Sequence, residues 1–297
     1  MNSTRQSLWM IVASLLFACM GVCVKLAAER YSAAEVVFYR SVISLVLIFV
    51  IVRGQGVSLA TPHWRLQFFR GASGFVSLLL YFYAIAMLPL ATAVTLNYTS
   101  PLFLVAYLVI FGRMRMPPSM VGALLVGFLG VALLLKPTFA ASQWLGGIIG
   151  LGSGVLAGLA FFNVRALGAL GEPESRTVFY FSLLSSFGAV LWMGFFGGFS
   201  FQAVDFKGAL LLGGVGCFAT FAQLAMTRSY RQGSAIVSAS LAYSAVIFAS
   251  FFGAAFWGER LGFDAWLAIA LITSSGIVAT WLSRKRSGAV VNPAEQD

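Results

Sequence analysis

"LYFYAIAMLPLATAVTLNYTSPLF", which spans Leu80–Phe103, contains parts of two long apolar runs that cover residues 67–87 and 91–111. A transmembrane helix needs about 20 mostly apolar residues, so each run is long enough to cross a bilayer. The connection between the runs is too short to hold a soluble domain. The stretch therefore predicts two consecutive membrane helices joined by a tight connection.

The composition extends this prediction to the whole chain of 297 residues. Hydrophobic residues make up 60% of it and charged residues 9%, and the mean hydropathy is +0.92. A soluble domain has about 45–50% apolar and about 25% charged residues, so this chain needs lipid to cover its apolar surface. We predict an all-α integral membrane protein with ten transmembrane helices. The expected spans are residues 8–27, 34–52, 67–87, 91–111, 119–136, 144–167, 177–197, 207–227, 234–256 and 264–282.

The two ends of the chain are read from the residues that flank the spans. The first span follows a weakly basic start, as a secretory signal peptide would, but nine further spans favour a helix that stays in the membrane. The sequence turns polar after Trp281. We expect residues 284–297 to form a basic and polar cytoplasmic tail without regular structure.

Basic residues indicate the orientation, because loops on the cytoplasmic side carry an excess of Lys and Arg. One set of connections carries most of them: Arg5, Arg53, Arg65, Arg70, Arg113, Arg115, Arg165, Arg176, Arg228, Arg231, Arg284, Lys285 and Arg286. The other set carries Lys25, Arg30, Lys136, Lys207 and Arg260. The bias predicts that both termini are cytoplasmic. It also explains the net charge of +10 by topology and lipid headgroups, without a nucleic-acid partner.

The two halves of the chain resemble each other weakly. "RGASGF" (Arg70–Phe75) aligns with "LGGVGC" (Leu212–Cys217), and "IFGRMRM" (Ile110–Met116) aligns with "FWGERLG" (Phe256–Gly262). The alignment predicts a first repeat in residues 1–138 and a second in residues 139–283. Five spans per repeat is an odd number, so the repeats would have opposite orientations, a common construction in secondary transporters. A duplication that yields only a symmetric scaffold stays open as the alternative.

Polar residues gather around a proline in the fourth span. Pro101 cannot donate a hydrogen bond to the carbonyl of Asn97, so the helix is expected to kink there. Asn97, Tyr98 and Ser100 lie in the same turn near the middle of the bilayer, and Tyr243 is the counterpart in the second half. A kinked helix with polar side chains at that depth is a candidate substrate site.

Four further residues are candidate site residues. Arg40 lies in "VVFYRSVISL" (Val36–Leu45), which is part of the second span. At 1.5 Å per residue, Arg40 is about 9 Å from the start of that span. It either reaches out to Glu35 or Glu29 at the membrane edge or binds an anion in a cavity. Tyr81, Asn163 and Gln223 would line the walls of the site or, alternatively, hold helices together.

Several chemistries lack the residues that they need. No carboxylate lies deep in a predicted span, the sole histidine, His63, lies in a loop, and there is no Walker motif. Coupling to protons or ATP is therefore not required by the sequence. We find no catalytic motif, and we expect no metal and no cofactor, because Cys19 and Cys23 have no nearby His or carboxylate. An intramembrane enzyme and a channel remain minor alternatives to a transporter.

The chain resembles the EamA-type members of the drug/metabolite transporter superfamily. The matching stretches are "AEVVFYRSVISL" (Ala34–Leu45), Leu80–Phe103, "GFLGVALLLKP" (Gly127–Pro137) and "FWGERLGFDAWLAIALITSSGIVAT" (Phe256–Thr280). In the first half, Arg113 stands in a stretch where relatives usually place a Glu after the glycine.

The resemblance implies secondary transport of small organic metabolites across the inner membrane by alternating access. Amino acids and related compounds are the typical cargo, often moved outward. S-adenosylmethionine and organic carboxylates are the alternatives, with uptake or exchange instead of export. The expected partners are the small-molecule substrate and the lipid bilayer, and the chain would act as a monomer or homodimer.

Overall fold

The computed structural model describes residues 3–138, 141–197, 202–258 and 261–291. All regular structure in these residues is helical, and ten helical segments are long and apolar enough to cross a membrane. The prediction of an all-α protein with ten spans is therefore confirmed. The α-helices are α1 (Ser3–Ser7), α2 (Trp9–Ala27), α3 (Ala33–Gly54), α4 (Trp64–Met87), α5 (Leu90–Asn97), α6 (Ser100–Ile110), α7 (Pro118–Leu135), α8 (Trp144–Ala169), α9 (Glu174–Trp192), α10 (Phe206–Gln232), α11 (Ala235–Ala242), α12 (Ser244–Trp257) and α13 (Phe263–Val291).

Two of the ten spans are interrupted in the middle. The fourth span consists of α5 and α6, which are separated at Tyr98 and Thr99. Pro101 lies in the first turn of α6, where its missing N–H has no intrahelical partner to lose. The ninth span consists of α11 and α12, which are separated at Tyr243 although no proline is near. The sequence predicted a kink at Pro101 from the chemistry of proline. For the ninth span, alignment of the two halves identified Tyr243 as a counterpart but predicted no interruption.

A stripe of glycines on α8 holds the interrupted fourth span. A Cβ added to Gly150 would lie 2.8 Å from a side-chain atom of Leu96, and one added to Gly154 would lie 2.7 Å from the carbonyl oxygen of Leu96. A Cβ on Gly158 would lie 2.9 Å from the carbonyl oxygen of Ser100. Only glycine permits such a close approach of two helix backbones, so the spacing of four residues serves helix packing.

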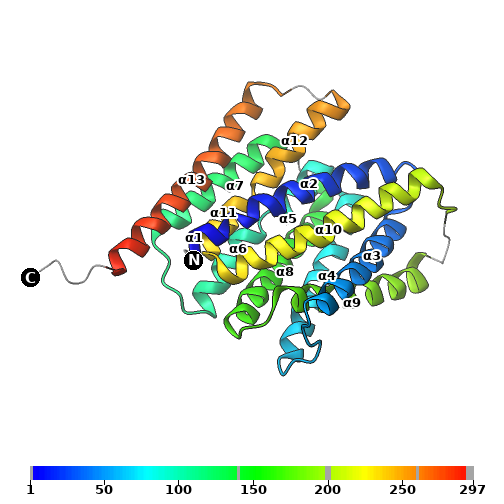
Figure 1. Ribbon diagram of the computed structural model, residues 1–297. Helices are drawn as coiled ribbons and strands as arrows, with labels where there is room; N and C mark the ends of the chain where they lie inside the picture. The colour runs from blue at the N-terminus through cyan, green and yellow to red at the C-terminus, as the bar shows by residue number, and fades with distance from the viewer. Residues whose placement is uncertain (1–2, 139–140, 198–201, 259–260, 292–297) are drawn as a thin grey trace, which may run out of the picture.

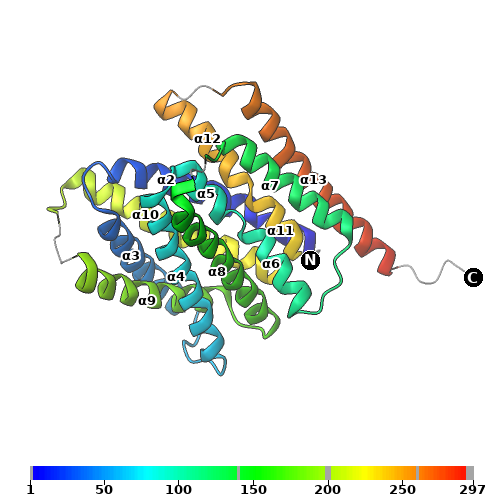
Figure 2. The same cartoon turned by 180° about the vertical axis from the view of Figure 1, so that it is seen from behind.

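The helices pack in pairs that join distant parts of the chain. α2 packs along α10, α4 along α8, α3 along α9, and α7 along α13. In Figures 1 and 2, α7, α12 and α13 form one side of the bundle, α3, α4 and α9 form the other, and α2, α8 and α10 lie between them. α8 also touches α10, whereas α2 and α4 have at most marginal contact in the described residues.

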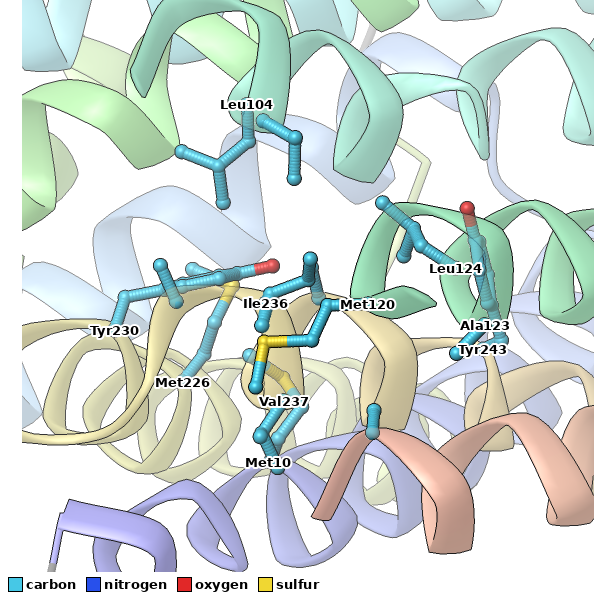
Figure 3. Packing of buried hydrophobic residues seen from close by; sticks show 14 of the residues in the cluster. Met10, Leu104, Met120, Ala123, Leu124, Met226, Tyr230, Ile236, Val237 and Tyr243 are labelled. Carbon is cyan, nitrogen blue, oxygen red and sulfur yellow. The ribbon is translucent and has the colours of Figure 1, made fainter. Parts of the chain in front are cut away.

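The main hydrophobic core lies between these two sides. It draws buried residues from α2, α6, α7, α8, α10, α11, α12 and α13. Figure 3 shows Met120, Ile236 and Val237 packed between Tyr230 and Tyr243, both of which are 0% exposed. Two tyrosine hydroxyls are therefore enclosed in an apolar cluster.

The polar tail differs from the prediction. α13 continues past Trp281 to Val291, so the tail begins as helix; residues 292–297 lie outside the described part of the chain. The expectation of no regular structure after Trp281 was wrong, because a helix that has left the bilayer can continue into water while its backbone hydrogen bonds stay intact. Lys285 lies over the ring of Trp281 at 5.3 Å and supports the helix where it leaves the apolar region.

Candidate functional site

The two helix interruptions meet inside the protein. The rings of Tyr98 and Tyr243 are 6.4 Å apart between centroids, and the ring of Phe128 is also 6.4 Å from Tyr243. The Tyr243 hydroxyl has no hydrogen-bond partner in the described residues, although a buried hydroxyl normally has one. Residues from the fourth and ninth spans are thus brought together, as the sequence analysis expected.

The Tyr230 hydroxyl is in the same situation. The ring of Tyr230 stacks on Phe161 with centroids 5.0 Å apart, and its hydroxyl is buried without a partner in the part of the chain described. Figure 3 shows this hydroxyl directed towards the middle of the cluster. Tyr230 was missed by the sequence analysis because it lies near the end of α10, where an aromatic residue is usually read as an interface anchor.

Asn97 and Ser100 lie against α8. The Asn97 side-chain amide donates to the Ser153 hydroxyl at 3.1 Å, which joins α5 to α8. Ser100 and Pro101 are buried, and the Ser100 carbonyl faces Gly158. In this conformation Asn97 holds two helices together, the role that was the alternative for residues of this kind.

Tyr81 and Asn163 lie in two different places. Tyr81 packs beside Leu96 and Ile149 in a small cluster between α4, α5 and α8. Asn163 on α8 is 6% exposed, and no hydrogen bond joins it to any residue of the described ranges.

A second polar group lies where α3, α4, α9 and α10 meet. Gln223 on α10 accepts a hydrogen bond from Nη2 of Arg70 at 3.3 Å. Arg70 is only 2% exposed, and its guanidinium lies 4.4 Å above the ring of Phe181 on α9. The sequence analysis counted Arg70 among the loop residues that set topology, and this was wrong. Arg70 faces the protein interior in the second turn of α4, and the position of its motif, "RGASGF", inside the repeat was the available signal.

Arg40 on α3 is partly buried, and its expected partner is engaged elsewhere. Nε of Arg40 is buried without a hydrogen-bond partner in the described residues. The Glu35 carboxylate accepts from the backbone N–H of Ser32 at 2.8 Å and of Gln202 at 2.7 Å, so it caps α3. Glu29 is exposed and makes no ion pair with Arg40. The alternative that Arg40 pairs with a carboxylate at the membrane edge is therefore wrong for this conformation.

The other carboxylates of the described residues also have partners away from Arg40 and Arg70. Ion pairs join Arg30 to Asp205, Lys136 to Asp264, Arg176 to Glu172, and Arg231 to Glu174. Burial raises the pKa of Glu172, but hydrogen bonds from Thr61, Arg176 and Gln67 outweigh it and leave the pKa below its ordinary value. The Glu172 carboxylate is thus ionised and already accepts hydrogen bonds from Thr61, Gln67 and Arg176.

Two apolar grooves on the bundle do not coincide with either polar group. The first is lined mainly by Leu8, Ile11, Leu241, Ile247, Ile272 and Trp281, and the second by residues of α5 and α8 such as Leu96 and Ile148. Their apolar walls suit lipid chains better than a polar substrate. No group of three His, Cys, Asp or Glu side chains that could hold a metal ion occurs in the described ranges.

Ten spans, two of them interrupted beside buried polar groups, define the architecture of a multi-pass membrane transporter. Comparison with known proteins identifies the family. The sequence profile of the EamA-like transporter family matches residues 4–136. The pseudopaline exporter of Pseudomonas aeruginosa is 33% identical over 84% of this chain and 86% of its own length. The chain belongs to the EamA-like transporter family of the drug/metabolite transporter superfamily.

More distant relatives show how far this likeness extends. A riboflavin transporter of Brucella anthropi is 25% identical over 76% of this chain and 81% of its own length. A solved crystal structure superposes with a TM-score of 0.85 at 18% identity and covers 95% of this chain and 100% of that one, which shows the fold. The resemblance found in the sequence is confirmed, and the family and these named relatives are transporters.

Proposed function

We propose that this protein exports small organic metabolites, amino acids or related compounds, across the inner membrane by alternating access. The observation that carries the proposal is the meeting of Tyr98 and Tyr243 at two helix interruptions, with a buried hydroxyl left unpaired. Irregular backbone inside a membrane protein is tolerated where it lines a substrate pathway. The likeness to a relative named an exporter supports the outward direction.

Helix packing supports two repeats of opposite orientation, residues 1–138 and 139–283. Glycines that align between the halves make corresponding contacts. A Cβ on Gly74 of α4 would meet Phe181 of α9 at 3.1 Å, and a Cβ on Gly216 of α10 would meet Ile43 of α3. The third span thus packs on the seventh as the eighth packs on the second, which is the relation expected of a pseudo-twofold axis.

One pair of corresponding contacts is unequal, and this supports alternating access. On the side of the membrane where the chain ends, Nη1 of Arg165 on α8 donates to the carbonyl of Gly233 at 3.0 Å. Gly168 also packs against Arg231, so α8 and α10 close this side. The equivalent helices of the first half, α2 and α4, do not close the opposite side in the same way. Two similar halves in unequal conformations are what an exchange between inward- and outward-facing states requires.

The loop charges support cytoplasmic termini. Removing Arg70 from the count still leaves most of the basic residues on the side of the termini. The closed side would then face the cytoplasm, and the conformation would be open to the outside. We further propose that Asn97, Tyr98, Ser100, Pro101, Tyr81, Asn163, Gln223 and Tyr243 belong to the substrate pathway, with Asn97 changing partners between states.

Counterflow in proteoliposomes tests this function. Liposomes loaded with one unlabelled amino acid are expected to accelerate the entry of the same labelled amino acid, and the entry should saturate. Tyr243→Phe should raise the substrate concentration that gives half-maximal entry, because it deletes the buried Tyr243 hydroxyl. Tyr83→Phe is the matched control, since Tyr83 is 41% exposed and lies against Trp192. Unsaturable flux without acceleration would mean a channel, and equal effects of the two variants would remove Tyr243 from the site.

A further inference from the structure

We propose that Arg40 and Arg70, together with Gln223, bind a carboxylate group of the transported compound. The inference rests on the proposed function and names the class of substrate: an organic anion whose carboxylate lies between the second, third and eighth spans. Arg70 was not part of the site expected from the sequence, and this group differs from the tyrosines at the helix interruptions.

Arg70 is a buried cation with too few acceptors. A guanidinium has five N–H donors, and the only hydrogen bond from Arg70 to a described residue is the 3.3 Å contact with the neutral amide of Gln223. Nε of Arg70 is buried and has no hydrogen-bond partner among the described residues. A charge inside a membrane protein is costly and is normally paired or faces a functional cavity. The four remaining donors therefore point to an anion as their partner.

Arg40 adds a second cation to the same region. Arg40 lies one helical turn before Ser44, whose hydroxyl donates to the carbonyl of Gly216 on α10 at 3.2 Å, so Arg40 is on the face of α3 that meets α10. The neighbouring Ser41 hydroxyl is buried and also unpaired. Two like charges repel, and an anion between them converts that repulsion into attraction.

The surroundings of Arg70 leave its edge free for a carboxylate. Cζ of Arg70 lies 4.4 Å from the ring centroid of Phe181, and Nη2 makes the guanidinium's one hydrogen bond to a described residue. Gly74 makes room on the same helix, since a Cβ there would lie 2.7 Å from Nη1 of Arg70. A planar fork of donors with one face supported is the arrangement that recognises a carboxylate by two parallel hydrogen bonds.

A purely structural role for Arg70 fits these contacts poorly. Glu172, the carboxylate that reaches α4, is bound at Gln67, a turn before Arg70, and already has Thr61 and Arg176 as partners. Arg165 shows what a structural arginine looks like in this protein, because its Nη1 donates to the carbonyls of Tyr230 and Gly233. Arg70 donates to no backbone carbonyl in the described residues, and its only acceptor there is the side-chain oxygen of Gln223.

Ligand-induced stabilisation of the purified full-length protein tests the site. The probes are pairs that differ only in charge: glutamate and glutamine, succinate and succinamide, phenylalanine and phenylalaninamide, with inorganic phosphate as a separate anion. A ligand that binds the folded state raises the melting temperature by mass action. At least one carboxylate should stabilise the wild type more than its amide does. In Arg70→Gln and in Arg40→Gln, the same rise in melting temperature should need at least ten times more of that carboxylate.

Matched controls lie on the same two helices. Arg65→Gln on α4 and Arg53→Gln on α3 change exposed arginines and should leave the carboxylate effect unchanged. Arg70→Lys keeps the charge and should retain part of it. Without ligand, Arg70→Gln should melt no lower than the wild type, because it removes an unpaired buried charge. A structural arginine would instead lower the melting temperature.

The outcomes separate this inference from the proposed function. Equal stabilisation by every carboxylate and its amide, or by phosphate and the best carboxylate, would overturn the carboxylate site. So would Arg70→Gln and Arg40→Gln variants that respond like the wild type. If counterflow of neutral compounds persists in those cases, the protein is a transporter of another class of substrate. Absence of counterflow for every probe would overturn both proposals.

Discussion

Replacing Gly158 by alanine tests the contact between α8 and the interrupted fourth span. A Cβ at Gly158 would lie 2.7 Å from Cβ of Phe103, 2.9 Å from the Ser100 carbonyl oxygen and 3.0 Å from the backbone N of Leu104. Two of these atoms belong to the backbone of α6, so no side-chain rotation can relieve the contact. α6 would have to move away from α8 just after the interruption at Tyr98.

The magnitude follows from a comparison with Gly152 on the same helix. A Cβ at Gly152 would meet only a side-chain atom of Leu80, at 3.4 Å, which is an ordinary contact. Alanine stabilises a helix interior by about 1 kcal/mol relative to glycine, and both variants share this gain. Overpacking costs about 1–3 kcal/mol and applies to Gly158→Ala alone. The difference between the two variants is therefore about 1–3 kcal/mol, or about 2–12 °C in melting temperature.

Thermal unfolding in detergent measures this difference, and counterflow in proteoliposomes measures its consequence. Gly152→Ala should melt at or above the wild-type temperature and transport normally. Gly158→Ala should melt several degrees lower than Gly152→Ala and transport more slowly, because the segment that carries Tyr98 is displaced. Equal melting temperatures for the two variants would refute the reasoning, since they would mean that α6 does not lie against Gly158 in the folded protein.

Two other predictions concern the closed side and the loop before α9. A disulfide between Gly168→Cys and Arg231→Cys, in a background without the native cysteines, should stop counterflow until a reductant is added. A Cβ at Gly168 would lie 3.0 Å from Cβ of Arg231, so the bond would hold α8 against α10. Undiminished counterflow after complete cross-linking would contradict alternating access at this contact. The pKa of Glu172 is lower in the folded state than in the unfolded state, so the ionised carboxylate contributes stability that is complete above about pH 4.5 and is lost as the pH falls through the lower folded value. Glu172→Gln should therefore lower stability by about 1–3 kcal/mol at neutral pH and flatten the loss of stability in acid, as followed by melting temperature against pH; an unchanged acid profile would mean that another carboxylate governs it.

The spans could be predicted from the sequence because a bilayer leaves few choices: every backbone group must be bonded within a helix, and length and hydropathy then locate the helices. Pro101 revealed its interruption by the hydrogen bond that it cannot make. Tyr243 gave no such local signal, and only alignment with the first half indicated a special position. Asn97 was predicted to bind substrate, and its partner in this conformation, Ser153, could not be predicted because it is a tertiary neighbour from another span.

The arginines show why the candidate site was harder to predict than the fold. Arg70 and Arg165 each lie near the end of a span, on the side of the membrane assigned to the two termini. A count of basic residues therefore treats both as residues that set topology. What distinguishes them is the supply of acceptors: Arg165 meets two backbone carbonyls at the end of α10, whereas Arg70 meets one amide oxygen and an aromatic face. Acceptors come from other helices, so their number depends on tertiary packing. A charge that the packed protein leaves short of acceptors is the one to examine for a ligand, because only another molecule can supply the missing hydrogen bonds.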